Sequence, residues 1–188
     1  MREKLSVLKE YFGHDSFREG QDRITDSLLG GRDVLGIMPT GAGKSICYQV
    51  PALMFDGITI VVSPLISLMK DQVSALVQSG VAAAYINSSL THAQYLKVLQ
   101  NTESGKYKII YVAPERLCAP AFLGICRNLN ISMVAVDEAH CVSQWGQDFR
   151  PSYLKIPDFI DALNSRPVVG AFTATATGAV RDDIKTLL

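Results

Sequence analysis

The chain has no excess of charge of either sign and no long apolar run. Its 188 residues include 18 basic and 18 acidic side chains, so the formal net charge is zero. A balanced chain has no overall positive field, so any nucleic-acid binding must come from a local groove or from another domain. No apolar stretch approaches the roughly 18 residues that cross a membrane, and the charged start, residues 1–4, is unlike a signal peptide. We therefore expect a protein that does not use a membrane.

Cysteine is also scarce. The four cysteines are at unrelated spacings with no Cys-x-x-Cys pair, which indicates neither a zinc site nor a disulfide framework. Buried thiols are the simplest interpretation. We expect an intracellular location, which is the cytoplasm (nucleoid) if the source is bacterial and the nucleus if it is eukaryotic.

The composition allows a sizeable core, because 48% of the residues are apolar. Short β-branched runs alternate with segments of helical periodicity, which is typical of a parallel sheet with helices on both faces. We predict one α/β domain over residues 1–188, although the spacing does not reveal the strand order. The predicted strands are 33–37, 58–63, 81–86, 108–112, 133–136 and 168–172, and the predicted helices are 1–12, 22–29, 46–50, 64–78, 91–100, 120–129 and 177–188.

One stretch, residues 38–45, is punctuated by glycine and lies between a predicted strand and a predicted helix. This is the context of a phosphate-binding loop. Gly41 and Gly43 let backbone N–H groups close around phosphate oxygens without interference from a Cβ atom. Lys44 would reach the outer phosphates, and Ser45 would place its hydroxyl on Mg²⁺. The stretch departs from the strict motif at Met38, where the motif has glycine.

The predicted strand 133–136 ends in Asp137 and Glu138, which suit the second half of an ATP site. Asp137 can hold Mg²⁺ directly or through water, and Glu138 can orient or deprotonate the water that attacks the γ-phosphate. His140 could couple this site to another or could be a polar side chain in a turn. Thr173 and Thr175 could bond to the acidic cluster or could cap the following helix.

Two further segments carry candidate ligand contacts. Gln21 offers the donor and acceptor that an adenine edge needs, and Arg18 or His14 could lie flat on the ring. A Gln at such a position is, however, more often an exposed structural residue. Residues 141–154 contain the only Trp of the chain in a polar loop. There, Trp145 and Phe149 could stack on bases or could anchor the loop to the core.

Taken together, these motifs resemble the RecQ family of DNA helicases, within helicase superfamily 2, over almost the whole chain. The segments that carry the resemblance are 17–21, 38–45, 63–72, 113–117, 137–140, 143–151 and 173–175. The family itself has Met at the position of Met38. The chain differs from the common family pattern at His14, Ala42, Gln147 and Ser152, where Tyr, Gly, His and Glu are frequent.

The resemblance implies a RecA-like P-loop fold and a set of site residues. Lys44, Asp137 and Glu138 would be catalytic, and Ser45 and Asp137 would bind Mg²⁺. ATP would contact His14, Arg18, Gln21, Thr40, Gly41, Ala42, Gly43, Lys44 and Ser45. Binding of DNA, or its coupling to ATP, would involve Ser63, Lys70, Arg116, His140, Gln144, Trp145, Asp148, Phe149, Arg150, Thr173 and Thr175.

The implied activity is that of an ATP-dependent 3′–5′ DNA helicase motor in DNA repair and recombination, acting on single-stranded and duplex DNA. The family pairs this domain with a second RecA-like domain, which carries arginines for the γ-phosphate, and usually with zinc-binding and winged-helix regions. We expect these parts to lie outside this chain, so that the chain alone hydrolyses ATP poorly. We also expect a monomer. The alternatives are a superfamily 2 RNA helicase and a non-catalytic, ATP-gated DNA-binding domain.

Overall fold

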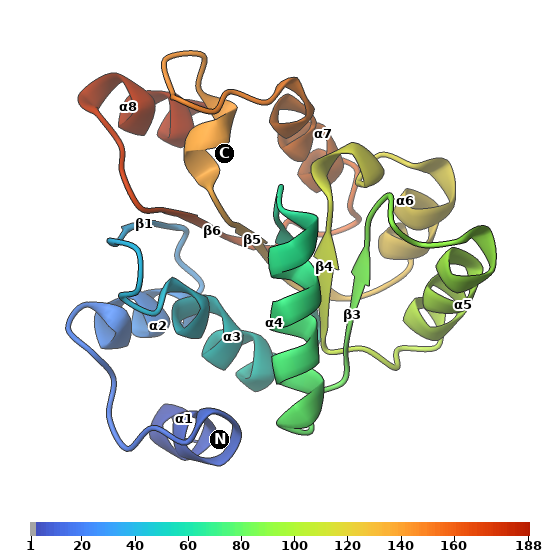
Figure 1. The fold of residues 1–188 in the computed structure, drawn as a ribbon, viewed down its shortest axis with the longest axis horizontal. Helices are drawn as coiled ribbons and strands as arrows, with labels where there is room; N and C mark the ends of the chain where they lie inside the picture. Colours follow the sequence, from blue (N-terminus) through green and yellow to red (C-terminus); the bar gives the residue numbers. More distant parts are fainter. Residues whose placement is uncertain (1–2) are drawn as a thin grey trace.

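The short β-branched and apolar runs of the sequence form one parallel sheet in the computed structural model, which describes residues 3–188 (Figure 1). Within those residues, the strand order is β1-β6-β5-β2-β4-β3, and each neighbouring pair is parallel. The strands are β1 (Val34–Ile37), β2 (Ile58–Val62), β3 (Ala83–Ile86), β4 (Ile109–Val112), β5 (Ile131–Val136) and β6 (Val168–Thr173). The predicted α/β class is confirmed.

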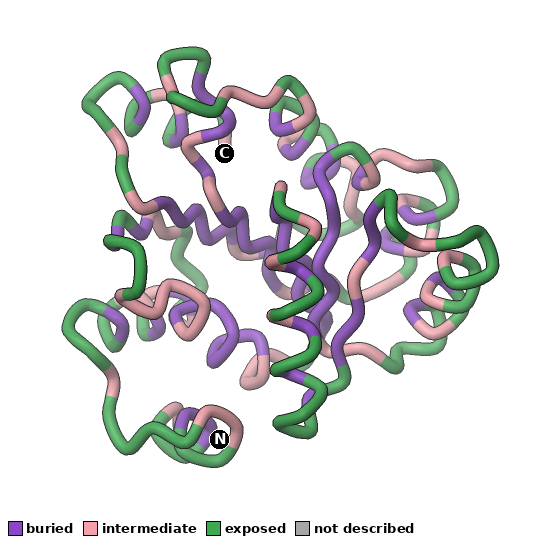
Figure 2. The backbone as a smooth tube through the Cα atoms, viewed as in Figure 1, coloured by how far each residue is buried: buried purple, intermediate pink, exposed green. Residues whose placement is uncertain are grey.

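Helices cover both faces of the sheet, which explains why the central strands are continuous apolar runs. All five residues of β2 are buried, and the burial map shows the strands as the most enclosed part of the chain (Figure 2). The α-helices are α1 (Lys4–Phe12), α2 (Gln21–Leu29), α3 (Lys44–Met54), α4 (Ile66–Gln78), α5 (His92–Glu103), α6 (Pro120–Arg127), α7 (Ile156–Asp161) and α8 (Gly178–Leu187). The first two residues of the helix predicted over 1–12 lie outside the described residues.

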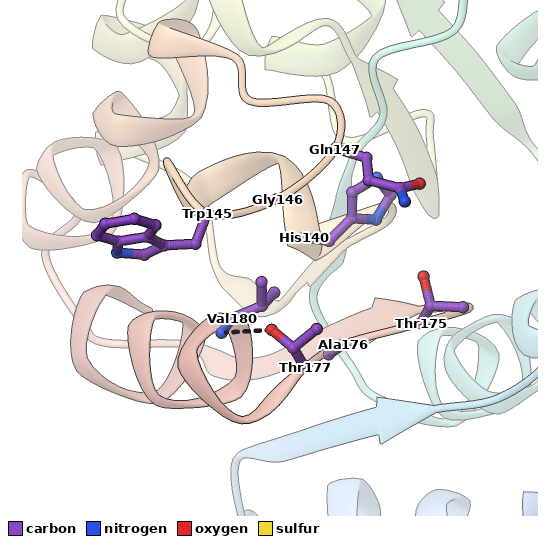
Figure 3. Close-up of a pocket in the computed structure, with 8 residues that line it drawn as sticks. All are labelled: His140, Trp145, Gly146, Gln147, Thr175, Ala176, Thr177 and Val180. Atoms are coloured by element: carbon purple, nitrogen blue, oxygen red, sulfur yellow. Dashed lines mark hydrogen bonds between the residues drawn. The ribbon is translucent and has the colours of Figure 1, made fainter.

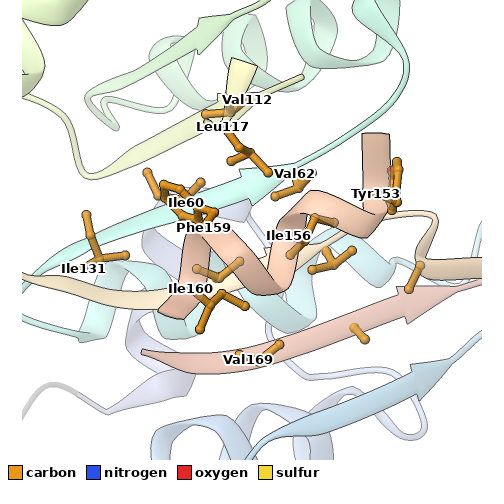
Figure 4. Close-up of a cluster of buried hydrophobic side chains, with 14 of the residues drawn as sticks. Ile60, Val62, Val112, Leu117, Ile131, Tyr153, Ile156, Phe159, Ile160 and Val169 are labelled. Atoms are coloured by element: carbon orange, nitrogen blue, oxygen red, sulfur yellow. The ribbon is translucent and has the colours of Figure 1, made fainter. Parts of the chain in front are cut away.

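Alternating side chains of each strand build two separate cores. Helices α2, α3 and α4 pack on one face through a cluster that includes Tyr48, Met69 and Phe172. Helices α5 to α8 pack on the other face, and Figure 4 shows Phe159 and Ile160 of α7 among the strand side chains. Helix α1 lies outside α3, against which it buries a small third cluster. No helix of residues 3–188 is long and apolar enough to cross a membrane.

The sequence prediction missed the 3-10 helices and α7. The 3-10 helices are η1 (Pro114–Arg116), η2 (Ala139–Val142) and η3 (Pro151–Lys155). Helix α7 has six residues, which is less than two turns, so a helical period cannot be recognised in it. Strand β3 begins at Ala83 rather than at residue 81, whereas β5 begins at Ile131, two residues earlier than predicted.

The ring of Phe172 occupies space that two glycines leave free. A Cβ atom on Gly36 of β1 would lie 2.8 Å from the ring, and so would a Cβ atom on Gly170. Phe172 is fully buried, and its ring centroid lies 5.2 Å from that of Tyr48 in α3. Close packing of this ring therefore holds α3, which follows the glycine-rich loop, against β1 and β6.

We expect Gly36→Ala to lower the free energy of unfolding by roughly 1–3 kcal/mol, because the buried ring has little room to move. Urea denaturation followed by circular dichroism measures the change. The matched control is Gly124→Ala in α6, where a Cβ atom meets nothing within 4 Å and φ is not positive. Alanine there should leave stability unchanged or raise it by up to about 1 kcal/mol. Equal effects at the two positions would contradict this account of Phe172.

Candidate functional site

The polar segments of the site follow neighbouring strands at one edge of the sheet. The glycine-rich loop follows β1, Thr173 ends β6 and Asp137 follows β5, and these three strands are adjacent. The Met38 N–H donates to the Thr173 carbonyl oxygen at 3.0 Å, which joins the first two segments directly. In open α/β sheets this edge is where ligands bind.

The loop has the backbone conformation that its glycines were predicted to supply. Gly41 and Gly43 have φ values of 81° and 79°, a region that other residues rarely adopt. Gly43 is the N-cap of α3, so Lys44 and Ser45 form the first turn of a helix whose positive end faces the loop. The Lys44 ammonium lies 3.5 Å from the carbonyl oxygen of Met38, within the loop.

Gln21 and Arg18 hold the outer side of this loop. The Gln21 amide donates to the carbonyl oxygens of Ala42 and Gly43 at 3.0 and 3.1 Å, and Arg18 donates to that of Gly41 at 2.9 Å. In a trans peptide the C=O and the following N–H point in opposite directions. The N–H groups of Gly43 and Lys44 therefore point away from Gln21, as a phosphate cradle requires.

This arrangement bears on the predicted adenine contacts. Gln21 is buried, not exposed, and its side-chain oxygen also accepts the backbone N–H of Arg18. Both ends of its amide are thus engaged with the protein. Arg18 lines a hollow beside the loop together with Ile37 and Pro39, whereas the exposed His14 does not line it. The adenine contacts of Arg18, Gln21 and His14 stay predictions, and bracing of the loop is a role of Gln21 that the sequence did not reveal.

Asp137 is held at the end of β5 by several contacts. Its backbone N–H donates to Val62 of β2, and its carbonyl oxygen accepts the Tyr153 hydroxyl at 2.8 Å. The carboxylate accepts the Glu138 N–H at 3.0 Å. Burial, and secondly the charge of Glu138, raise the pKa of Asp137 to about 6, against the opposing effect of Lys44. The sequence analysis did not predict the hydrogen bond from Tyr153, because residues 141–154 were interpreted as a polar loop.

Glu138 adopts the left-handed backbone region, with φ of 49°, and is the one non-glycine residue of 3–188 that does so. Such a conformation costs about 1–2 kcal/mol and persists only where the surroundings enforce it. Here it turns the chain sharply from β5 into η2. The turn aims the Glu138 side chain back toward His140, whose Nδ1 atom lies 3.3 Å from the Glu138 carboxylate.

Hydrogen bonds connect His140 with Thr173 and Thr175, for which the sequence left alternatives open. His140 Nδ1 lies 2.9 Å from the Thr173 hydroxyl, which itself donates to the Thr175 carbonyl oxygen at 3.0 Å. Neither threonine caps α8, because that cap is Thr177, which accepts from the Val180 N–H. His140 thus connects the acidic turn after β5 with the end of β6.

Residues 143–150 project from this junction as the aromatic loop. Trp145 is 76% exposed and Phe149 is partly exposed, so Trp145 does not anchor the loop to the core. Figure 3 shows Trp145 extending away from His140 beside a hollow that Thr175 also lines. A Cβ atom on Gly146 would lie 2.6 Å from the His140 carbonyl oxygen, so only glycine allows the loop to approach so closely.

Two further contacts attach the aromatic loop to its surroundings. The Ser143 hydroxyl donates to Asp183 of α8 at 2.6 Å. Arg150 pairs with Asp148 at 2.9 Å and also donates to the carbonyl oxygen of Pro64, which follows β2. Arg150 therefore links the loop to the segment that was predicted to contact DNA.

The remaining predicted DNA contacts are spread over the same edge of the sheet. Lys70 is exposed on α4, Gln144 is exposed in the aromatic loop, and Arg116 lies over the ring of Tyr95 at 5.9 Å. Ser63 is fully buried, and its hydroxyl has no hydrogen-bond partner within residues 3–188. The structure brings none of these four against Lys44.

The residues that were predicted to bind Mg²⁺ suit that ion. Magnesium prefers oxygen ligands, and Ser45 and Asp137 offer a hydroxyl and a carboxylate. Burial raises the pKa of Asp137, and a cation bound beside the carboxylate would stabilise its charged form. Both the donor chemistry and the electrostatics therefore fit the ion.

Comparison with known proteins agrees with this geometry. A family model described as DEAD/DEAH box helicase matches residues 18–184. The chain is 52% identical to the ATP-dependent DNA helicase RecQ of Bacillus subtilis over 180 residues, which are 95% of this chain and 30% of that protein. It is 48% identical to RecQ of Pasteurella multocida, covering 96% of this chain and 28% of the relative.

Solved structures show the same fold at lower identity. A hypothetical ATP-dependent RNA helicase from Sulfolobus tokodaii superposes with a TM-score of 0.77 at 22% identity, over all of this chain and 55% of that one. The DUF1998 helicase MrfA bound to DNA superposes with a TM-score of 0.76 at 17% identity, over all of this chain and 29% of that one. The chain spans only about 30% of the length of the RecQ relatives.

We expect Asp137→Asn to raise the melting temperature of the ligand-free chain at pH 8. A pKa raised from 3.8 to about 6 corresponds to a cost of about 3 kcal/mol for the ionised form in the folded state. This cost is nearly absent below pH 3.8, develops between pH 3.8 and about 6 and is constant above that, so wild-type stability falls between the two pKa values. The variant should melt several degrees higher at pH 8, by roughly 2–4 °C per kcal/mol.

The difference between variant and wild type should shrink as the pH is lowered from 8 to 4, which differential scanning calorimetry can follow. Asp182→Asn, which is exposed and lies beyond the first turn of α8, is a suitable control for a change of charge. Identical melting temperatures of Asp137→Asn and wild type at pH 8 would show that the carboxylate is not destabilised by burial.

Proposed function

Because the chain belongs to the DEAD/DEAH box helicase family, in which it is a first motor domain of the RecQ type, we propose that it is the ATP-binding half of a 3′–5′ DNA helicase. One observation carries the proposal. The phosphate-binding loop, the acidic turn and the exposed aromatic loop are joined through the ends of three adjacent strands. An arrangement of this kind can transmit a change at the nucleotide to bound DNA.

In the proposed mechanism, ATP binds with its phosphates at the N-terminus of α3. Lys44 neutralises the outer phosphates, and the N–H groups of Gly43 and Lys44 donate to phosphate oxygens. Mg²⁺, held by Ser45 and Asp137, would supply charge neutralisation on the phosphates. Glu138 orients and deprotonates the attacking water, and its backbone turn fixes it at the end of β5.

The His140 contacts provide the route of coupling. His140 contacts both the Glu138 carboxylate after β5 and the Thr173 hydroxyl at the end of β6. A movement of Glu138 when its water reacts would therefore be passed through His140 to the end of β6. The aromatic loop begins three residues after His140, and Arg150 ties that loop to Pro64. Trp145 is exposed and suited to stack on a base of single-stranded DNA.

The proposal needs a second motor domain to complete the ATP site. The RecQ relatives extend well beyond the matched region, and helicase sites of this type take an arginine from the other wall of the cleft. Such an arginine is worth about 10³–10⁵ in rate. Single-stranded and duplex DNA are the proposed substrates, and repair and recombination are the proposed processes.

DNA is favoured over RNA as the substrate by the named relatives. The proteins with 48–52% identity are called DNA helicases. The RNA helicase neighbour has 22% identity and is therefore similar in fold alone. A non-catalytic role is not favoured, because Lys44, Asp137 and Glu138 are all present in one site.

We expect Glu138→Gln to retain binding of Mg²⁺–ATP but to lower ATP hydrolysis by roughly 10²–10⁴-fold, the usual contribution of a general base. Lys44→Ala should instead lose the binding itself. Binding is measured on this chain with a fluorescent ATP analogue, and hydrolysis on a longer chain that includes the second motor domain. Glu103→Gln, exposed at the end of α5, is the control. An unchanged rate in Glu138→Gln would remove the catalytic interpretation.

We expect the 188-residue chain alone to hydrolyse ATP slowly, with little stimulation by single-stranded DNA, because one wall of its cleft lies in another domain. Phosphate release with and without an oligonucleotide measures this. Robust DNA-stimulated turnover by this chain would show that the site is complete without a second domain.

A further inference from the structure

Three side chains of different chemistry converge beside the acidic turn. His140, Cys141 and Asp148 each offer one ligand atom, and these atoms all lie within 4.8 Å of one another. Cys141 Sγ is 3.8 Å from His140 Nε2 and 3.8 Å from Asp148 Oδ2. In a tetrahedral zinc site, bond lengths of about 2.0–2.3 Å place neighbouring ligand atoms roughly 3.3–3.7 Å apart. The two contacts of Cys141 Sγ are close to this spacing, and an ion would draw His140 and Asp148 closer to each other.

The tautomer of His140 leaves Nε2, the ring nitrogen beside Cys141, free to bind a metal. With the Thr173 hydroxyl donating to Thr175 and the Glu138 carboxylate 3.3 Å from Nδ1, both neighbours of Nδ1 act as acceptors, which favours the tautomer with its proton on Nδ1. In the neutral ring Nε2 then carries the lone pair, and Nε2 is the atom that faces Cys141. A lone pair, a thiol and a carboxylate thus meet at one point.

The surroundings of His140 are those of a metal-binding histidine. Ligating histidines almost always donate their other N–H to a carboxylate, a carbonyl or water, which fixes the ring. His140 Nδ1 lies 3.3 Å from the Glu138 carboxylate and 2.9 Å from Thr173. This pair of contacts would hold the ring while Nε2 binds the ion.

The charges and the access route also suit a divalent cation. A thiolate and a carboxylate together balance a 2+ ion. The ion would displace Arg150, which donates to the same Asp148 oxygen at 2.9 and 3.1 Å. Burial raises the pKa of the Cys141 thiol to about 12, so binding must displace the thiol proton. Asp148 is exposed, which gives an ion access to the cluster from the solvent, and His140 also lines the open hollow in Figure 3.

We propose that His140, Cys141 and Asp148 form a three-ligand site for zinc or a similar thiophilic divalent ion. On binding, the Cys141 S–H bond breaks, its proton passes to the solvent and the sulfur binds the ion, with no change of oxidation state. Such ligands select zinc or cobalt over magnesium, which prefers oxygen. The site is therefore distinct from the magnesium position at Ser45 and Asp137.

The ion would act on the junction between the acidic turn and the aromatic loop. Asp148 now pairs with Arg150, which also bonds to Pro64. Binding would draw Asp148 toward Cys141 and fix the distance between the turn and the loop. We expect bound zinc to inhibit the coupling of DNA binding to ATP hydrolysis. This expected inhibition rests on the proposed function, whereas the binding of zinc does not.

The test is titration of the 188-residue chain with Co²⁺ and Zn²⁺ in the presence of excess Mg²⁺, without nucleotide or DNA. We expect one ion per chain, a thiolate-to-cobalt charge-transfer band that Zn²⁺ abolishes, and a change in the emission of Trp145, the only Trp. Cys141→Ser should abolish the band, and Asp148→Asn should weaken binding at least about 10-fold. Cys118→Ser and Cys126→Ser are matched controls that should keep both.

Cys141 is fully buried, so circular dichroism must confirm that Cys141→Ser is folded. Asp148 is exposed, so Asp148→Asn tests the site even if the cysteine variant does not fold. Absence of the thiolate band in the wild type, or binding that Asp148→Asn leaves unchanged, would overturn the proposal. Either result would leave the proposed function standing, because ATP binding is measured separately with Lys44→Ala.

Discussion

Parallel hydrogen bonding between β1, β6 and β5 is the constraint on which the candidate site depends. Because these strands run in one direction, their carboxyl ends meet at a single edge, and the loops that follow them must lie side by side. Lys44, Thr173 and Asp137 are far apart in the sequence, yet this register places them on adjacent strand ends. The ring of Phe172 packs over Gly36 and Gly170 and against Tyr48, and so holds the helix that follows the phosphate loop on these strands.

Two energetically unfavourable features lie together at the same edge. Asp137 is a buried carboxylate with a raised pKa, and Glu138 has a strained backbone. The Tyr153 hydroxyl and the ladder bond to Val62 hold this turn in place. Violations of local preference that the fold supports from several sides are typical of functional sites. Here the strain lies between the proposed nucleotide site and His140.

The local sequence was enough to predict the strands and the polar residues that follow them. It was not enough to predict the strand order or the tertiary contacts of the site, for physical reasons that can be named. The strands and the polar residues after them follow from β-branched runs and glycine turns, so the positions of Lys44 and Asp137 at strand ends were predicted. Strand order was not, because chain spacing does not specify pairing. The bonds of Gln21 to the loop carbonyls depend on tertiary approach. Cys141 and Asp148 are seven residues apart, a spacing that indicates a metal site only once Gly146 folds the loop back on His140.

The pairing of β1 with β6 also determines the order in which the molecule can be completed during biosynthesis. β1 lies at one edge of the described sheet, and its strand partner is β6, whose residues begin at Val168. At typical translation speeds, the ribosome reaches β6 on the order of ten seconds after β1. During that interval the glycine-rich loop is tethered to an unpaired strand. In a nascent chain, the Met38 N–H at the start of the loop therefore lacks its partner, the Thr173 carbonyl oxygen, until β6 has been made.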